Sequence, residues 1–99
     1  MRTLMKVQMD TEAASEAIKN GTMQTVLQST MDSLKPEAAY FTTEDGMRTA
    51  FIVFDLQEPA QLPTIAEPLF RPLKAKIFMS PVMTAEDVQA GLQQLAKSM

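Results

Sequence analysis

The 99-residue chain contains no cysteine and no histidine. The absence of cysteine excludes disulfides, thiolate nucleophiles and cysteine-ligated metal sites. The absence of histidine removes the commonest general base and the commonest ligand of transition metals. Any acid–base chemistry must therefore use carboxylates, lysine, tyrosine or water, and we expect the protein to carry no metal and no cofactor.

Positive charge is also scarce. The chain has nine lysine and arginine residues and twelve acidic ones, which gives a net charge of −3. Lys6, Lys74 and Lys76 come nearest to a basic patch, and they are too few to replace the counterions of a nucleic acid. The longest apolar run, Ala50 to Phe54, is far too short to span a bilayer. The first six residues contain no apolar segment of the kind a signal peptide needs. These features predict a cytoplasmic protein without nucleic-acid or membrane partners.

The length predicts a single domain over residues 1–99. A domain of this size buries only about 60–65% of the surface that its unfolded chain exposes, and it therefore gains much stability from association. Hydrophobic residues make up 45% of the chain and charged residues 21%, which excludes a disordered tail.

The first half of the chain begins with a strand. Residues 3–9 alternate between apolar and mixed side chains, which is typical of a half-buried strand. Asp10 then provides an N-cap, and apolar residues recur at helical spacing as far as Leu34. Pro36 ends this helical region. Asn20-Gly21 is a helix-stop signal in its middle, so residues 11–34 form either one kinked helix or two short ones.

The clearest local signal is a hairpin. Two β-rich runs, Ala38–Thr43 and Arg48–Leu56, flank Asp45-Gly46, the preferred pair for a two-residue type I′ turn. This turn sets a register in which three residue pairs lie opposite each other: Thr43 and Arg48, Phe41 and Ala50, Ala39 and Ile52.

The remaining chain predicts a short helix over Ala60–Glu67 that ends before Pro68, and a strand over Leu73–Ser80. A last helix begins at Thr84, where Thr84 to Asp87 form a variant capping box. The element order predicts an α+β fold, specifically a ferredoxin-like β-α-β-β-α-β sandwich with a four-stranded antiparallel sheet and an extra C-terminal helix.

In this arrangement the helices cover one face of the sheet and leave the other face open. Alternation places the following residues on that open face: Leu4, Lys6, Gln8, Tyr40, Thr42, Phe51, Val53, Asp55, Lys76 and Phe78. A solvated sheet face is mostly polar, whereas this one carries three aromatic side chains. Contiguous apolar area of this kind marks an interface or a binding groove. Two such faces pressed together predict a symmetric homodimer with a closed cavity between the sheets.

The candidate residues for function lie on this face. As an enzyme, the protein would use Asp55 as a base, with its pKa raised by the apolar wall, and Lys6 as an electrophile or anion clamp. Ligand binding would involve the remaining polar and aromatic residues of the face, namely Gln8, Tyr40, Phe51, Val53, Lys76 and Phe78. Two alternatives stay open: a binder of an apolar or aromatic metabolite without catalysis, and a structural or regulatory module in which the open face only makes an oligomer. In the structural interpretation Lys6 or Lys76 simply pairs with Asp55 at the rim.

Three short segments resemble one known superfamily. They are Lys6-Val7-Gln8-Met9 in the first strand, Val53-Phe54-Asp55 at the end of the third, and Pro68-Leu69-Phe70 after the second helix. The chain resembles the dimeric α+β barrel superfamily, and within it the muconolactone isomerase-like proteins. The resemblance implies a homodimer or a higher oligomer with a ligand cavity on the sheet face. It also implies an isomerase or a cofactor-free oxygenase acting on a small organic metabolite, but chemistries that use a cavity histidine do not transfer.

Overall fold

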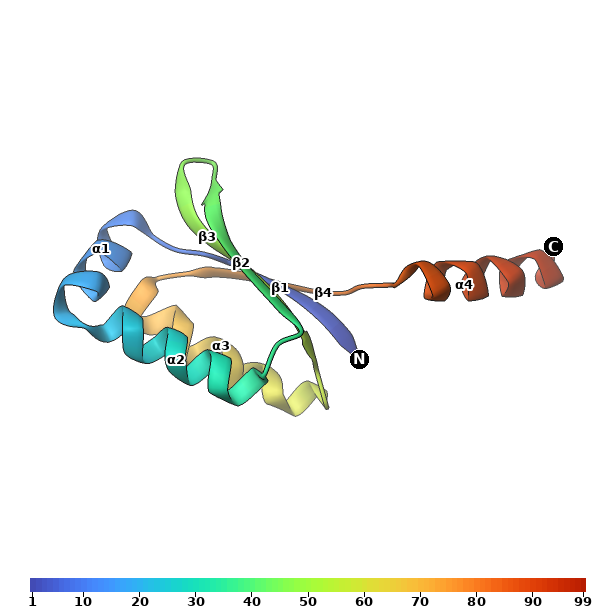
Figure 1. The fold of residues 1–99 in the computed structure, drawn as a ribbon, viewed down its shortest axis with the longest axis horizontal. Coiled ribbons are helices and arrows are strands. Elements are labelled where there is room, and N and C mark those ends of the chain that lie inside the picture. The colour runs from blue at the N-terminus through green and yellow to red at the C-terminus, as the bar shows by residue number, and fades with distance from the viewer.

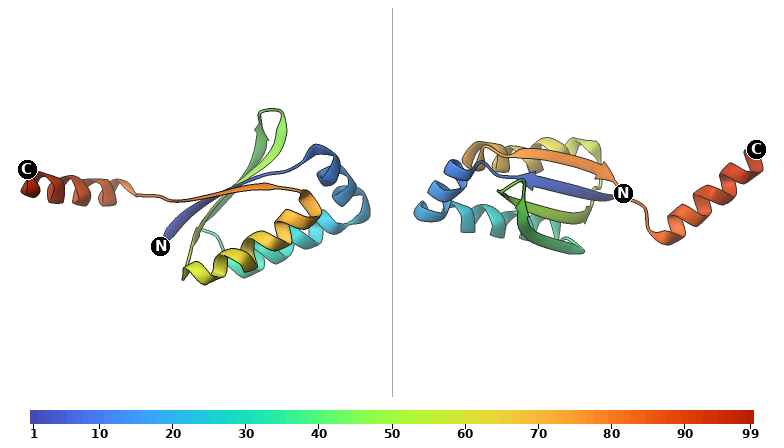
Figure 2. Two further views of the ribbon diagram at one scale, coloured as in Figure 1. Left: turned by 180° about the vertical axis from the view of Figure 1, so that it is seen from behind. Right: turned by 90° about the horizontal axis from the view of Figure 1, so that it is seen from above.

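The structure is a computed structural model that describes all residues from 1 to 99. Four antiparallel strands form one sheet in the order β2-β3-β1-β4, and helices α1 to α3 cover one of its faces (Figures 1 and 2). The elements are β1 (Arg2–Gln8), α1 (Thr11–Asn20), α2 (Thr22–Leu34), β2 (Ala38–Glu44), β3 (Met47–Asp55), a 3₁₀ turn η1 (Pro59–Gln61), α3 (Leu62–Leu73), β4 (Lys76–Pro81) and α4 (Ala85–Ser98). The fold is α+β, as predicted, and is compatible with the ferredoxin-like arrangement.

The core lies between the sheet and these three helices. The central strands β1 and β3 contribute alternate side chains that are at most 1% exposed, and small and branched residues of the helices pack against them. The fully buried members are Met5, Val7, Ala14, Ala50, Ile52, Phe54, Leu69 and Leu73. The alternation predicted for these strands is therefore confirmed on the helix side.

The β2–β3 hairpin has the predicted turn and register. Asp45 and Gly46 both adopt left-handed backbone conformations, with φ of 55° and 74°. Two consecutive positive φ angles define a type I′ turn, whose twist matches that of the flanking strands. Phe41 lies opposite Ala50 and Ala39 opposite Ile52, as the turn chemistry predicts.

Residues 11–34, which the sequence predicted as either one kinked helix or two short ones, form two helices. Gly21 separates α1 from α2 because its φ of 85° lies in the left-handed region, where glycine carries no steric penalty. At the start of α1, the Asp10 carboxylate accepts a hydrogen bond from the backbone N–H of Ala13 at 2.9 Å, which makes it the N-cap.

The third helix is longer than predicted. The prediction ended it at Glu67, before Pro68, but α3 continues to Leu73 with Pro68 and Pro72 inside it. A proline inside a helix costs about 3 kcal/mol or more. Ile65, Leu69 and Leu73 recur every four residues and are all buried, so packing against the sheet outweighs that cost. Because Leu73 completes α3, strand β4 begins at Lys76, later than predicted.

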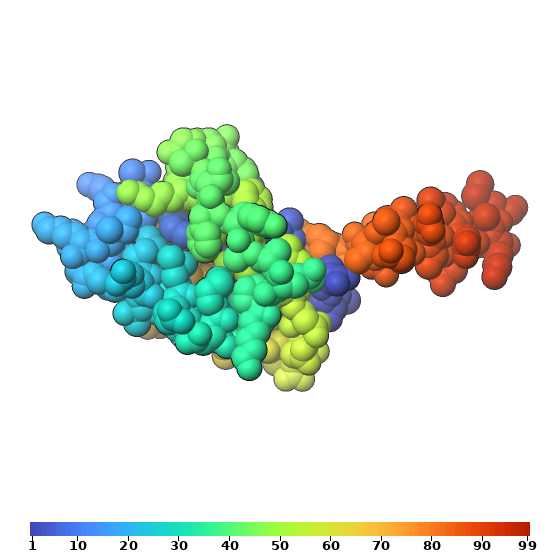
Figure 3. Space-filling model, viewed as in Figure 1, coloured from blue at the N-terminus to red at the C-terminus, as the bar shows by residue number.

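Helix α4 stands apart from the rest of the molecule. Thr84 is its N-cap and forms a capping box with Asp87, as predicted, yet every residue of the helix from Ala85 to Ser98 is exposed. Figures 1 and 3 show α4 projecting beyond the end of β4. The radius of gyration of 16.1 Å exceeds the roughly 13 Å expected for a compact chain of this length. None of the four α-helices combines the length and the hydropathy that crossing a bilayer requires.

Candidate functional site

The strand register aligns four residues in a row across the open face. Tyr40 of β2 lies opposite Phe51 of β3, Phe51 lies opposite Lys6 of β1, and Lys6 lies opposite Phe78 of β4. Neighbours in such a row are close enough for their side chains to touch. Tyr40 is 70% exposed and Phe78 48% exposed, while Lys6 and Phe51 are half-buried. The middle of the face is thus an aromatic surface with a single lysine in it, and we call these four residues the central row.

The hairpin curves over this face. Glu44 is the last residue of β2, yet its carboxylate lies 2.8 Å from Nζ of Lys6, and its carbonyl accepts a hydrogen bond of 3.3 Å from Nε2 of Gln8. Both contacts reach from the turn end of the hairpin to β1 across β3, which requires a strong bend toward the side opposite the helices (Figures 1 and 2). As a result, Gln8 and Thr49 are buried although they belong to the open face. The face is therefore concave.

One aromatic and one charged neighbour hold the side chain of Lys6. Its Nζ lies 4.7 Å from the centroid of the Phe78 ring, within the range of a cation–π interaction, and it pairs with Glu44 as described. The side chain of Lys6 is 28% exposed and that of Glu44 37%. The predicted candidate residue Lys6 thus stands at the centre of the site, as one half of an ion pair.

Glu44 was missed in the sequence prediction. The predicted strand ended at Thr43, one residue short of the observed end of β2. Extending the alternation of Tyr40 and Thr42 by one step places Glu44 on the open face. Its contact with Lys6, however, depends on the bend of the hairpin, which no local pattern encodes.

Asp55 lies at the other end of the face and has a different partner from the one expected. Its carboxylate is 2.6 Å from the N-terminal ammonium of Met1 and accepts a hydrogen bond of 2.7 Å from Nε2 of Gln57. The hydrogen bond and charge of that ammonium lower the pKa of Asp55. The prediction of a raised pKa was wrong, because the Asp55 carboxylate is 66% exposed and pairs with the N-terminal ammonium instead of lying against an apolar wall.

The Asp55 carboxyl should titrate below the ordinary aspartate value of 3.8. A group whose pKa is depressed on folding stabilises the folded state above its unfolded pKa, and that contribution disappears as the pH falls through the folded pKa. We therefore expect an NMR titration of the side-chain carboxyl carbon to give a midpoint under 3.8, and acetylation of the N-terminal amine to raise it. A midpoint of 3.8 or higher in the unmodified protein would show that the ammonium contact is not populated.

The other predicted residues of the face lie around the central row. Val53 pairs with Leu4 and both are half-buried, which extends the apolar surface toward Asp55. Lys76 of β4 lies opposite Gln8 of β1. It is exposed and takes part in none of the ion pairs. The structure thus gathers the predicted ligand-binding residues around Lys6 and leaves Asp55 apart.

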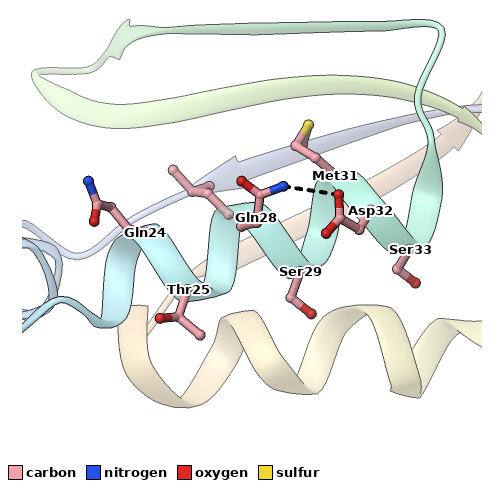
Figure 4. A pocket seen from close by; sticks show the side chains of 8 residues that line it. Gln24, Thr25, Gln28, Ser29, Met31, Asp32 and Ser33 are labelled. Atoms are coloured by element: carbon pink, nitrogen blue, oxygen red, sulfur yellow. Dashed lines mark hydrogen bonds between the residues drawn. The ribbon is translucent and has the colours of Figure 1, made fainter.

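Several hollows lie away from the central row. One follows the outward side of α2 (Figure 4), where Nε2 of Gln28 donates to the Asp32 carboxylate at 3.0 Å. All of its lining residues belong to that one helix, so it has no opposing wall. No cluster of acidic side chains is arranged to hold a metal ion.

Another hollow is an apolar groove of about 330 Å³ between the hairpin and helices α1 and α2. The predicted register places Phe41 on the helix side of the sheet, with the core residues, but its ring is 55% exposed and lines this groove. We call this hollow the hairpin groove, and its lining residues are Met9, Ile18, Met23, Leu27, Phe41, Thr42, Arg48 and Thr49.

Comparison with known proteins does not assign the chain to a family. A scan against models of protein families and a search of curated proteins both found no match to the chain. The α+β fold with its four-stranded antiparallel sheet is therefore the level at which the protein is classified.

Proposed function

We propose that the protein is a homodimer of the dimeric α+β barrel type, closed through the open sheet face, and that the enclosed space binds a small apolar or aromatic metabolite. The strand order β2-β3-β1-β4 with helices on one face supports the ferredoxin-like arrangement that such a dimer needs. The observation that carries the proposal is the central row, an aromatic surface across all four strands with a tethered lysine in its middle.

The shape and chemistry of the face support a ligand site in addition to an interface. Tyr40, Phe51 and Phe78 offer rings against which a planar apolar ligand can stack. Lys6 and Lys76 provide positive charge beside them, so a ligand with an anionic group is favoured. A second copy placed over the concave face would exclude water and strengthen these electrostatic contacts.

The enzymatic form of the proposal follows the resemblance to muconolactone isomerase-like proteins, with isomerase or cofactor-free oxygenase activity. In this form Lys6 polarises a substrate oxygen, and Glu44 takes over the role of base that was predicted for Asp55, because Glu44 is the carboxylate beside Lys6. The pairing of Glu44 with Lys6 and the lowered pKa of Asp55 favour the second form, a binder without catalysis. A ligand recovered chemically unchanged after incubation would support the binder.

Benzoate is a suitable probe of the site because it joins one aromatic ring to one carboxylate. We expect benzoate to raise the melting temperature of the full-length protein more than the uncharged benzamide does. Lys6→Met should weaken benzoate binding by about tenfold or more, since it removes a charged hydrogen-bond donor and leaves Glu44 to repel the ligand. Ligand-observed NMR measures both affinities.

The matched control for this experiment is Lys19→Met. Lys19 is an exposed lysine in the last turn of α1, on the helix layer that covers the other face of the sheet. This variant should bind benzoate like the unmodified protein. Equal loss of affinity in both variants, or no preference for benzoate over benzamide, would refute a charged site on the sheet face.

A further inference from the structure

Helix α4 presents an apolar stripe with nothing to cover it within its own chain. Val88, Leu92 and Leu95 follow the spacing of one helix face, and their exposed fractions are 39%, 58% and 54%. An isolated helix of this length is marginal in water, and most helices in proteins derive their stability from packing of such a stripe. The stripe therefore indicates that α4 folds against another surface.

The hairpin groove is an apolar surface of matching character on the same chain. It is lined by five hydrophobic residues, and two of them, Ile18 and Phe41, are 53% and 55% exposed. Its own α4 lies too far away to fill it. Pro81, where β4 ends and the chain leads into α4, pairs with Thr3, whereas the hairpin turn lies at the opposite end of β1, beyond Gln8 (Figures 1 and 3).

We propose that α4 of one copy docks into the hairpin groove of a second copy, so that the dimer exchanges its C-terminal helices. This inference rests on the sheet-face dimer proposed above. If the two-fold axis makes the stacked β1 strands run in opposite directions, the Pro81 end of each sheet overlies the hairpin end of the other. The C-terminal helix of each copy then emerges beside the groove of its partner.

The charges of the two surfaces are complementary. Glu86 and Asp87 lie in the first turn of α4, and Arg48 lines the groove beside Phe41. The acidic start of α4 thus meets Arg48 when the apolar stripe enters the groove, which favours a second copy over a partner with a basic helix.

Disulfide trapping tests this contact cleanly because the chain has no cysteine of its own. Two single-cysteine chains with different affinity tags, Leu92→Cys and Ile18→Cys, are co-expressed at full length and oxidised. We expect a disulfide-linked heterodimer on a non-reducing gel. Gln93→Cys, on the polar side of α4, replaces Leu92→Cys in the matched control and should give little of this product. A charge-reversed Arg48→Glu background should lower the yield, and adding Glu86→Lys should restore it.

The outcomes distinguish a failure of helix exchange from a failure of the proposed sheet-face dimer. A heterodimer yield that is high with Leu92→Cys and low with Gln93→Cys supports helix exchange. If light scattering shows a dimer but the Leu92→Cys and Ile18→Cys chains do not cross-link, helix exchange is wrong and the sheet-face dimer stands. A dominant cross-link between two Leu92→Cys chains would instead indicate that the two α4 helices pair with each other, and it would also overturn the proposal. A monomer would refute both.

Discussion

Phe51→Asp is expected to abolish the proposed dimer. Phe51 lies in the middle of the central row, opposite Tyr40 on one side and Lys6 on the other. In the proposed dimer an aspartate at this position is buried among aromatic rings, and an unpaired buried charge costs several kcal/mol. We expect the dissociation constant of the dimer to rise by about a thousandfold or more. Sedimentation velocity on the full chain over a range of concentrations measures this change.

Phe70→Asp is the matched control for the sheet face. Phe70 is 40% exposed and belongs to α3, in the helix layer, so this variant introduces the same charge away from the proposed interface. It should sediment like the unmodified protein. Circular dichroism of both variants distinguishes dissociation from unfolding, and in this small domain either result for Phe51→Asp agrees with a covered face. A Phe51→Asp variant that remains a folded dimer would exclude Phe51 from the interface.

Phe54→Ala should cause the largest loss of stability within the folded chain. Phe54 is 1% exposed and belongs to the main core beneath α1 to α3. Truncation of a buried phenylalanine typically costs about 3–5 kcal/mol, because it removes the apolar burial and leaves a cavity. Such a loss is a large part of the about 5–15 kcal/mol that stabilises a typical domain. We therefore expect the midpoint of urea denaturation to fall sharply or the variant to be unfolded.

Phe70→Ala again provides the comparison, because the same side chain is removed from an exposed position. Its cost should stay below about 1 kcal/mol. A loss for Phe54→Ala no greater than that for Phe70→Ala would contradict the packing described for the core. Because Phe51 and Phe54 point to opposite faces of β3, the two phenylalanines separate association from folding.

Features set by neighbouring residues were predictable from the sequence. The Asp45-Gly46 turn determines the hairpin register, since Asp-Gly is a preferred pair for the type I′ turn that joins twisted strands through two residues. Once that register is known, alternation assigns Phe51 and Val53 to the open face. Gly21 marks a helix break for the same local reason, its left-handed backbone.

Features that depend on distant contacts were not predictable in this way. Pro68 is a helix breaker by local rules, and only the packing of Leu69 and its neighbours on the sheet explains why α3 continues through it. The pairing of Glu44 with Lys6 arises from the curvature of the hairpin over β1. Asp55 pairs with the N-terminal ammonium, a partner that strand alternation does not reveal.

The candidate site was therefore predictable as a surface and not as a set of interacting groups. The aromatic members of the central row and Lys6 follow from alternation and strand order. The carboxylate of the site does not, because Asp55 and Glu44 belong to the same face and differ only in their neighbours. Helix α4 shows the same limit: its stripe is plain in the sequence, but its position away from the core is a property of the whole fold.

The most direct test of the proposed closure of the sheet face is an isotope-filtered NOE experiment on a mixture of labelled and unlabelled chains. It detects only contacts between the two copies. We predict intermolecular NOEs from the ring protons of Phe51 and Phe78 to the face of the other copy, including Tyr40. A spectrum with no such contacts from these rings, or with contacts only from the helix layer, would contradict a dimer closed through the sheet face.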